Sequence, residues 1–415
     1  MTEQDLVDVV VVGGGIAGSS LAASLARAGL EVEVLERETK FVDRVRGEWM
    51  APWGVIEAQR LGVYDDLMRA GGHHIARAIN YDELIEPARA EEGAVPIEGI
   101  LPGVPCALSM EHVAMQNCLF DRAVLDGATV VRGVNDVAVQ PGTLPVVEFS
   151  HDGKRHLRKC RLIVGADGRT SIVRRRVGLS LDERQIDHLI SGVLVDGVPE
   201  WPQDVQSLGK AGDVMYLGFP QGDGKMRLYV EYDPRERGKY SGAAGAINLL
   251  KAFDVKYLRY GAAVAQGNPI GPCNAFPSQD AVLEKPFCDG VVLIGDAAGY
   301  TDPISGQGLA STFRDVRLVR ELLIENPVWD KSMFRTYGEE RKERVRRIMC
   351  VTKLMATLYA RFDPDSRVRR ARAIHRLFVE PDPELFGLAI ASFAGPDAVP
   401  AEVFTDAYCE RIFAP

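Results

Sequence analysis

Residues 8–18 read DVVVVGGGIAG and decide the fold. The four valines form a short apolar run typical of a buried parallel strand, and glycines follow at the spacing G-x-G-x-x-G. In that pattern Gly13 allows a tight turn, Gly15 lets the backbone approach a pyrophosphate, and Gly18 lets a helix pack on the strand. The stretch therefore predicts the strand–turn–helix start of a dinucleotide-binding α/β domain.

The next segments complete this unit. Residues 21–29, LAASLARAG, predict a small-residue helix, and residues 31–37, EVEVLER, predict a second strand. Glu36 ends that strand, where a carboxylate can accept hydrogen bonds from both hydroxyls of a ribose. The motif does not distinguish NAD from FAD. The candidate contacts with the dinucleotide are Gly13, Gly15, Ile16, Ala17, Gly18, Glu36 and Arg37.

Two acidic turns occur later in the chain, GADGR at 165–169 and GDAAG at 295–299. Each follows an apolar strand, so Asp167 and Asp296 are expected at strand carboxyl ends, where open α/β sheets bind ligands. Asp296 is placed to hydrogen-bond a polyol such as a ribityl chain. The alternative for either residue is an aspartate that caps a helix, and for Asp167 both interpretations stay open.

A proline- and glycine-rich segment follows the second acidic turn. Residues 302–309 read DPISGQGL and lead into a strongly predicted helix over 308–325. The first N–H groups of that helix can face a ligand atom on which negative charge grows. The candidate contacts here are Pro303, Gly306, Gln307, Gly308 and Leu309.

The residue pattern changes between about 185 and 270, where apolar and polar residues alternate in several segments and predict an antiparallel sheet. The expected fold class is α/β: a Rossmann-type domain assembled from discontinuous segments, an inserted substrate-binding sheet, and a helical C-terminal region. The expected boundaries are 1–75, 108–184 and 271–329 for the nucleotide domain, 76–107 and 185–270 for the sheet, and 330–415 for the helices.

Composition narrows the class of protein. The chain has 415 residues and a net charge of −9, which argues against binding nucleic acid or an anionic membrane surface. Its seven cysteines are scattered without a C-x-x-C pair, so no metal site is predicted and a reducing cytoplasm is expected. Neither a signal peptide nor a membrane-spanning run is recognisable. We expect a cytoplasmic monomer or homodimer that acts on a small molecule.

The three motifs, in this order and spacing, resemble the p-hydroxybenzoate-hydroxylase-type flavoproteins over about residues 8–325. These are single-component FAD monooxygenases with relatives among flavin halogenases and geranylgeranyl reductases. The resemblance implies FAD as cofactor and NADPH or NADH as co-substrate, docking without a second glycine fingerprint. It implies hydroxylation of a small organic, typically aromatic, substrate by O2 through a flavin C4a-hydroperoxide.

The resemblance also assigns roles to residues. It implies that Gly13, Gly15, Gly18 and Glu36 hold the ADP half of FAD and that Asp296 holds the ribityl chain. Asp167 falls in a motif associated with both FAD and NAD(P)H. The two residues expected nearest the chemistry are Arg46, close to the pyrophosphate or flavin, and Pro303, close to the flavin C4a edge.

The sequence departs from the family at several positions, which keeps other functions open. Gly299 stands where hydroxylases often have His, and His112 stands where a helix usually opens with an FAD-contacting Arg; a surface position is favoured for His112. The halogenase signature W-x-W-x-I-P is absent, since Trp49 and Trp53 occur in EWMAPW. The alternatives are a flavin-dependent reductase of an alkene or prenyl substrate, a flavin halogenase, and a non-catalytic flavin-binding protein.

The substrate site is the least determined by sequence. Aromatic residues of the predicted sheet and of EWMAPW are candidates, with a place in the core as the alternative for each. Arg227 shares a strand face with Tyr229 and can bind a carboxylate, although a solvated position is favoured. No catalytic base is identified, and His73, His74 and His188 are candidates by residue type only. The candidate substrate contacts are Trp49, Trp53, Tyr216, Phe219, Arg227, Tyr229 and Tyr232.

Overall fold

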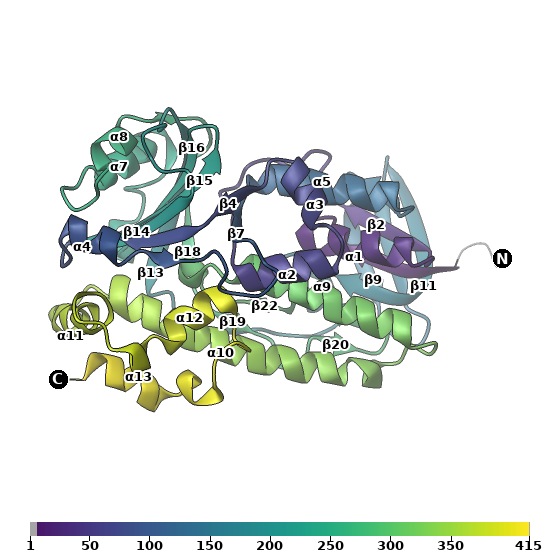
Figure 1. Cartoon of the computed structure of the whole chain (residues 1–415). Helices are drawn as coiled ribbons and strands as arrows, with labels where there is room; N and C mark the ends of the chain where they lie inside the picture. The colour runs from purple at the N-terminus through teal and green to yellow at the C-terminus, as the bar shows by residue number, and fades with distance from the viewer. Residues whose placement is uncertain (1–5, 415) are drawn as a thin grey trace.

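The computed structural model describes residues 6–414. Figure 1 shows a mixed sheet with a parallel centre and helices packed on it, a second sheet beside it, and long helices running beneath both. The fold class is the α/β architecture that the sequence predicted, with sheets built from segments far apart in the chain.

The first sheet is centred on β1 (Leu6–Val12), which pairs in parallel with β2 (Val32–Glu36) and with β11 (Lys154–Gly165). Val9 and Val11 pack into one buried cluster, and Val10 and Val12 pack into another on the opposite face. The strand is apolar throughout because both of its faces are covered. The other strands of this sheet are β8 (Thr129–Arg132), β9 (Asn135–Gln140), β10 (Val146–His151), β20 (Phe287–Cys288) and β21 (Val291–Leu293).

The turn after β1 requires glycine at two positions. Gly13 has φ +103°, and a Cβ there would overlap the backbone of Ala166 on the neighbouring strand. A Cβ on Gly18 would overlap the carbonyl oxygen of Gly13. Without those atoms α1 (Ile16–Arg27) packs directly on the sheet, where it contacts α5 (His112–Leu125) and α9 (Gly308–Glu325).

The second sheet contains the antiparallel strands β13 (His188–Asp196), β16 (Lys225–Tyr232), β15 (Val214–Gly222) and β14 (Val205–Ala211). β5 (Arg77–Asn80) joins it in parallel to β14, so a segment from much earlier in the chain, within the range 76–107, belongs to the same sheet. Its remaining strands are β6 (Val95–Pro96), β17 (Asn268–Pro269) and β18 (Asn274–Ser278).

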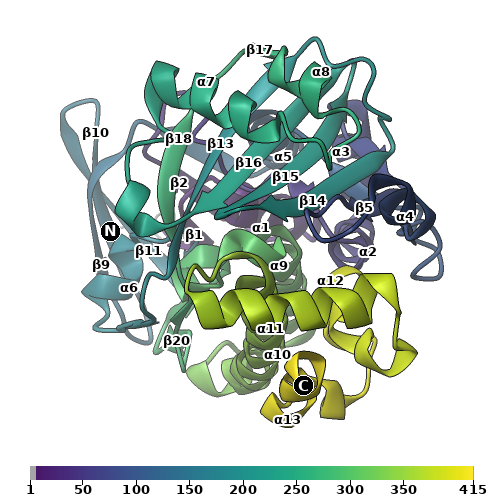
Figure 2. The same cartoon turned by 90° about the vertical axis from the view of Figure 1, so that its left-hand side faces the viewer.

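Helices cover the second sheet from two directions (Figure 2). α7 (Gly242–Phe253) and α8 (Gly261–Ala265) lie on one side of it, and the C-terminal helices lie on the other. Side chains of both groups join the strands in one large buried cluster. The C-terminal helices are α10 (Arg335–Tyr359), α11 (Pro364–Ile374), α12 (Gly387–Ala394) and α13 (Asp406–Phe413).

Short elements connect these layers. Two three-stranded sheets contain β3 (Trp49–Met50), β7 (Ala107–Ser109) and β4 (His73–Ile75), and β12 (Asp182–Glu183), β19 (Ala281–Val282) and β22 (Gly299–Tyr300). Among residues 6–414, no helix has both the length and the apolar character needed to cross a membrane. The remaining α-helices are α2 (Pro52–Arg60), α3 (Tyr64–Arg69), α4 (Pro87–Glu92) and α6 (Ile172–Arg176).

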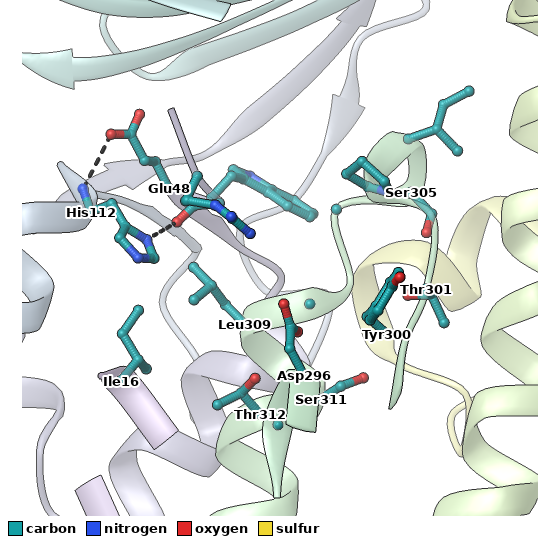
Figure 3. Close-up of a pocket in the computed structure, with 18 of the residues that line it drawn as sticks. Ile16, Glu48, His112, Asp296, Tyr300, Thr301, Ser305, Leu309, Ser311 and Thr312 are labelled. Atoms are coloured by element: carbon teal, nitrogen blue, oxygen red, sulfur yellow. Dashed lines mark hydrogen bonds between the residues drawn. The ribbon is translucent and has the colours of Figure 1, made fainter. Parts of the chain in front are cut away.

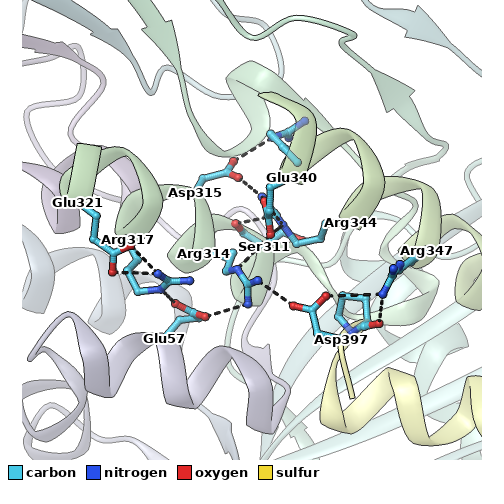
Figure 4. A network of polar contacts seen from close by, with 12 residues as sticks. Glu57, Ser311, Arg314, Asp315, Arg317, Glu321, Glu340, Arg344, Arg347 and Asp397 are labelled. Atoms are coloured by element: carbon cyan, nitrogen blue, oxygen red, sulfur yellow. Dashed lines mark hydrogen bonds and ion pairs between the residues drawn. The ribbon is translucent and has the colours of Figure 1, made fainter. Parts of the chain in front are cut away.

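A buried ion-pair network fixes α9 and α10 to the first sheet (Figure 4). Asp315 is fully buried and accepts hydrogen bonds from the backbone N–H of Gly295 at 2.9 Å, from Arg341 at 3.1 Å and from Arg344 at 2.6 Å. One carboxylate therefore joins both helices to the turn that follows β21.

We predict that Asp315→Ala lowers the free energy of unfolding by about 3–5 kcal/mol, because the buried guanidinium groups of Arg341 and Arg344 lose the buried carboxylate that they share. Asp397→Ala is the matched control, since this carboxylate pairs with Arg314 at 2.8 Å but its side chain is 60% exposed. The control should cost about 1 kcal/mol or less. Urea denaturation of both variants measures the difference, and equal losses would contradict the role given to Asp315.

Candidate functional site

One continuous cavity of about 690 Å³ runs from the carboxyl edge of the first sheet to the face of the second sheet. Its volume lies in the range of small-molecule and cofactor sites. Most of the predicted dinucleotide contacts line it. They are Gly13, Gly15, Ile16, Ala17, Glu36, Arg37, Arg46, Asp167, Asp296, Pro303, Gly306, Gly308 and Leu309.

The start of α1 opens directly into this cavity. Gly15 is its N-cap and no side chain caps the helix, so the first N–H groups are free for another acceptor. A Cβ on Gly15 would point into open space, with the amide of Gln116 nearest at 4.0 Å. Gly18 faces away from the cavity and serves helix packing, as its place in the motif predicts.

Glu36 is buried at the edge of the cavity and shapes the glycine turn. Its carboxylate accepts hydrogen bonds from the backbone N–H groups of Gly14 at 2.6 Å and Glu38 at 2.7 Å. Arg37 lies at the exposed rim and pairs with Glu38 at 3.0 Å. Asp136, which the sequence did not single out, lines the same end with φ +51°. Nothing in its local sequence marks it, because the pairing of β8 with β2 is what brings the start of β9 there.

Asp167 caps a helix, which is one of the two roles that the sequence left open for it. One of its oxygens accepts hydrogen bonds from the N–H groups of Ile172 at 2.6 Å and Val173 at 3.1 Å, at the start of α6. The other oxygen is buried without a partner, and the residue lines the cavity. Capping and contact with a ligand are therefore compatible at this position.

Asp296 lies in the 3₁₀ turn η3 (Gly295–Ala298), directly after β21. Its carboxylate is 35% exposed, faces the cavity and pairs with Arg169 at 3.3 Å. Figure 3 shows Asp296 in the same pocket as Ile16 of α1 and Leu309 of α9. Two neighbouring segments near residue 300 thus meet the start of α1 from the other end of the chain.

The segment 302–309 forms the turn η4 (Pro303–Ser305) and then the start of α9. Gly306 has φ +67°, and a Cβ there would lie 2.8 Å from the ring of Trp49, so both the backbone and the space require glycine. Since no side chain caps α9 either, its first residues present free N–H groups to the cavity. Two helix starts therefore face one space.

Gln307 and Trp53 differ from the expectation, because they contact each other rather than the cavity. The indole N–H of Trp53 donates to the side-chain oxygen of Gln307 at 2.8 Å, and the Gln307 amide donates to the carbonyl of Ser392 at 3.0 Å. Gln307 is 1% exposed and is absent from the cavity lining. Both side chains tie the α9 start to α12.

Arg46 and His112 face the cavity between the two sheets. Within residues 6–414, Arg46 has no carboxylate at ion-pair distance, which leaves its guanidinium available to an anionic ligand. His112 donates from Nδ1 to the carbonyl of Gly47 at 2.8 Å and lines the cavity, so the expected surface position is wrong. Burial lowers the pKa of His112 and keeps the imidazole neutral, so its Nε2 is an acceptor.

The aromatic candidates divide into two groups. Trp49, Phe219 and Tyr229 line the cavity. Tyr216 does not: it is fully buried in the core and donates its hydroxyl to the carbonyl of Tyr81. Tyr232 is also buried, with its ring against Tyr240.

Arg227 is buried rather than solvated, which corrects the sequence expectation. It forms a two-pronged ion pair with Glu48 and a further bond to Asp43 at 2.9 Å. Glu48 also accepts from Gln221 at 2.8 Å and from the backbone N–H of His112 at 3.1 Å. Nε and Nη2 of Arg227 are engaged by these carboxylates, whereas Nη1 is buried without a partner. Because the side chain lies outside the cavity lining, Arg227 is not placed to bind a substrate carboxylate.

A second buried ion pair lies behind the Pro303 turn. Nε2 of His188 on β13 is 3.0 Å from Glu231 on β16 and 3.3 Å from Asp302, which caps η4. Burial alone lowers the pKa of His188, but the two carboxylates outweigh it and raise that pKa to about 10. The cation attaches the turn that presents Pro303 to the second sheet.

The far end of the cavity is apolar and was missed from sequence. It lies between the second sheet and the C-terminal helices, and its lining comes from short stretches with no common motif. Two amides, Asn80 and Gln206, stand among its apolar side chains. The apolar residues include Leu208, Leu217, Leu354, Met355, Leu358, Leu377, Phe378, Phe386, Leu388, Ile390 and Phe393.

Comparison with known proteins agrees with this arrangement. A sequence model of the family described as FAD binding domain matches residues 6–352. Mouse squalene monooxygenase is 25% identical over 341 residues, which cover 77% of this chain and 55% of that protein. Digeranylgeranylglycerophospholipid reductase 2 from Methanopyrus kandleri is 25% identical over 332 residues, 77% of each chain.

The fold is also similar to that of a solved structure. A probable FAD-dependent monooxygenase from Pseudomonas aeruginosa superposes with a TM-score of 0.72 at 20% sequence identity. The match covers 87% of this chain and 98% of that one.

The His188 ion pair predicts a specific pH dependence of stability. Because the native pKa of about 10 exceeds the ordinary value of 6.5, the stabilisation by His188 is complete below pH 6.5 and is lost as the pH rises toward 10. His188→Gln should cost about 3–5 kcal/mol at pH 6. Urea denaturation at several pH values should show this deficit shrinking toward pH 10. The exposed His375 provides the control His375→Gln, and a deficit independent of pH would contradict the assignment.

Proposed function

Because this chain belongs to the FAD binding domain family, it is an FAD-dependent enzyme, and we propose that it is a monooxygenase acting on a small organic substrate. NADPH or NADH would supply the electrons, and O2 would supply the oxygen atom. One observation carries the proposal: the cavity edge with two helix starts and Asp296 is continuous with an apolar space. The first part suits a dinucleotide, and the second suits a substrate.

The residues present fit FAD. We propose that the start of α1 holds the pyrophosphate, because a Cβ on Gly15 would occupy open space there. Glu36 is proposed to bind the ribose. Asp296 would bind the ribityl chain, and the free N–H groups of Gly308 and Leu309 would face the flavin ring. Bound there, FAD supplies hydride acceptance and the activation of O2.

The remaining residues are proposed to control the surroundings of the reaction. Arg46 places a positive charge without a carboxylate partner beside the proposed pyrophosphate and flavin positions. Pro303 has no backbone N–H group to offer the cavity. The rings of Trp49 and Phe219 form an apolar part of the cavity wall. A dry lining of this kind excludes water, which a monooxygenase needs to avoid releasing peroxide.

The reductant is proposed to dock only transiently. The sequence contains a single G-x-G-x-x-G fingerprint, at residues 13–18, so no second dinucleotide domain is available for NAD(P)H. Asp167, with one unpaired buried oxygen on the cavity wall, is the residue we associate with this step.

A flavin-dependent reductase is the second candidate. It is favoured by the similarity to digeranylgeranylglycerophospholipid reductase, whose name describes a lipid with long hydrocarbon chains. Squalene monooxygenase also names a hydrocarbon. The apolar lining accommodates either chemistry, and the mass of the product separates them.

The purified protein should contain FAD and should oxidise NADPH or NADH faster when substrate and O2 are present. Incubation of a metabolite extract with enzyme, reductant and ¹⁸O-labelled O2 should yield a product that carries one labelled oxygen atom, detected by mass spectrometry. Turnover that continues without O2 and adds two hydrogen atoms would overturn the monooxygenase proposal in favour of the reductase.

Gly15→Ala should fold normally but lose FAD, because its methyl group enters only the space proposed for the pyrophosphate. The expected change is at least about tenfold weaker binding of FAD, or about 1.4 kcal/mol. Measurement by flavin fluorescence titration of the apoprotein tests this, with the melting temperature of the apoprotein as the control. Unchanged FAD affinity would contradict the placement.

A further inference from the structure

Two buried amides at the apolar end of the cavity lack hydrogen bonds. Asn80 is 8% exposed and Gln206 is 5% exposed, and both line the cavity. Neither amide atom of Asn80 has a partner in the described structure, and the side-chain oxygen of Gln206 has none. An unpaired buried polar group costs about 1–3 kcal/mol, so such groups are normally paired.

The register of the sheet places these amides next to each other. β5 and β14 pair in parallel, with Ala78 opposite Gln206 and Asn80 opposite Leu208. Because side chains alternate along a strand, all four belong to one face, and the two amides are diagonal neighbours. The phenol of Tyr359 on α10 lies beside Asn80 and interacts with its amide, although no hydrogen bond of normal geometry joins the two side chains.

The side chains that line this end of the cavity carry no charge. Residues 76–100, 190–276 and 345–393 contribute the apolar end of the cavity, and none of their side chains that line it belongs to Asp, Glu, Lys, Arg or His. The buried cations next to these strands are already engaged, since Arg370 pairs with Asp82 at 2.6 Å and Lys210 donates to the carbonyl of Arg361 at 3.0 Å. An ionised ligand group would therefore lose its hydration without gaining a partner.

We propose that Asn80 and Gln206 bind an uncharged, mostly apolar substrate through one edge that carries a carbonyl beside an N–H or O–H group. An amide offers both a donor and an acceptor, so two neighbouring amides complement an edge of mixed polarity. This inference rests on the proposed function, because it places the substrate in the cavity that continues from the flavin site. It also excludes carboxylate substrates.

Three two-ring probes of similar size test the inference: 2-quinolone, with a neighbouring carbonyl and N–H; 2-methylnaphthalene, with neither; and 2-naphthoate, an anion. Equilibrium dialysis against the FAD-loaded protein measures their binding without requiring turnover. We expect 2-quinolone to bind at least about tenfold more tightly than 2-methylnaphthalene, and 2-naphthoate to bind most weakly.

Asn80→Leu and Gln206→Met should each weaken 2-quinolone binding about fivefold, the equivalent of about 1 kcal/mol, and leave 2-methylnaphthalene unchanged or stronger. Should Asn80→Leu not fold, Asn80→Ala tests the same contact by removing atoms only. Ser207→Ala is the matched control: its hydroxyl is also buried and unpaired, but it alternates to the other face of β14 and does not line the cavity.

Two results would overturn the inference: 2-naphthoate binding as tightly as 2-quinolone, or the same probe ranking in wild type and in the Asn80 and Gln206 variants. The second result, with a raised melting temperature in the variants, would mean that the amides are only hydrated. Failure of the proposed function is distinguishable, because it would appear as loss of FAD or of labelled-oxygen incorporation while the amide-dependent probe ranking persists.

Discussion

The close approach of backbone to backbone at the start of α1 is the constraint on which the rest of this structure depends. Gly13 lies against Ala166 of the strand next to β1, and Gly18 lies against Gly13, with no room for a Cβ at either position. The helix can therefore begin at the very edge of the sheet. Because α9 begins at the same edge, the unpaired N–H groups of two helices reach one space, and a polyanionic cofactor complements both.

The second sheet is held over this space by buried charges. Arg227 joins β16 to Glu48, beside the cavity, and His188 joins β13 and β16 to Asp302, next to Pro303. Buried ion pairs gain little net stability against well-packed apolar groups, but each tolerates few alternative arrangements. In this fold they fix the position of the second sheet relative to the turn that contains Pro303.

The C-terminal helices complete the cavity with apolar side chains, and Gln307 ties α12 to the start of α9. This chain thus combines the family's motifs with an apolar cavity lining that no local sequence motif marks. In this chain the lining is uncharged at its far end, which distinguishes it from a pocket for a carboxylate.

The sequence by itself determined the features that depend on neighbours in the chain. Valine runs, glycine spacing and strand-terminal aspartates act within about twenty residues, so β1, the α1 start, Glu36 and Asp296 were all located from them. The helix over 308–325 was found with its bounds for the same reason. Even the two interpretations of Asp167 were recognisable locally, since capping involves residues only five and six positions away.

Only the tertiary structure decided the roles that depend on distant partners. Arg227 was expected in solvent because its partner Glu48 is 179 residues away, and Gln307 was expected at the cofactor because Trp53 is 254 residues away. Asn80 and Gln206 form a pair only through the parallel register of β5 and β14. A side chain's burial and partners are properties of packing, whereas a turn or a helix start is fixed by the backbone preferences of a few consecutive residues.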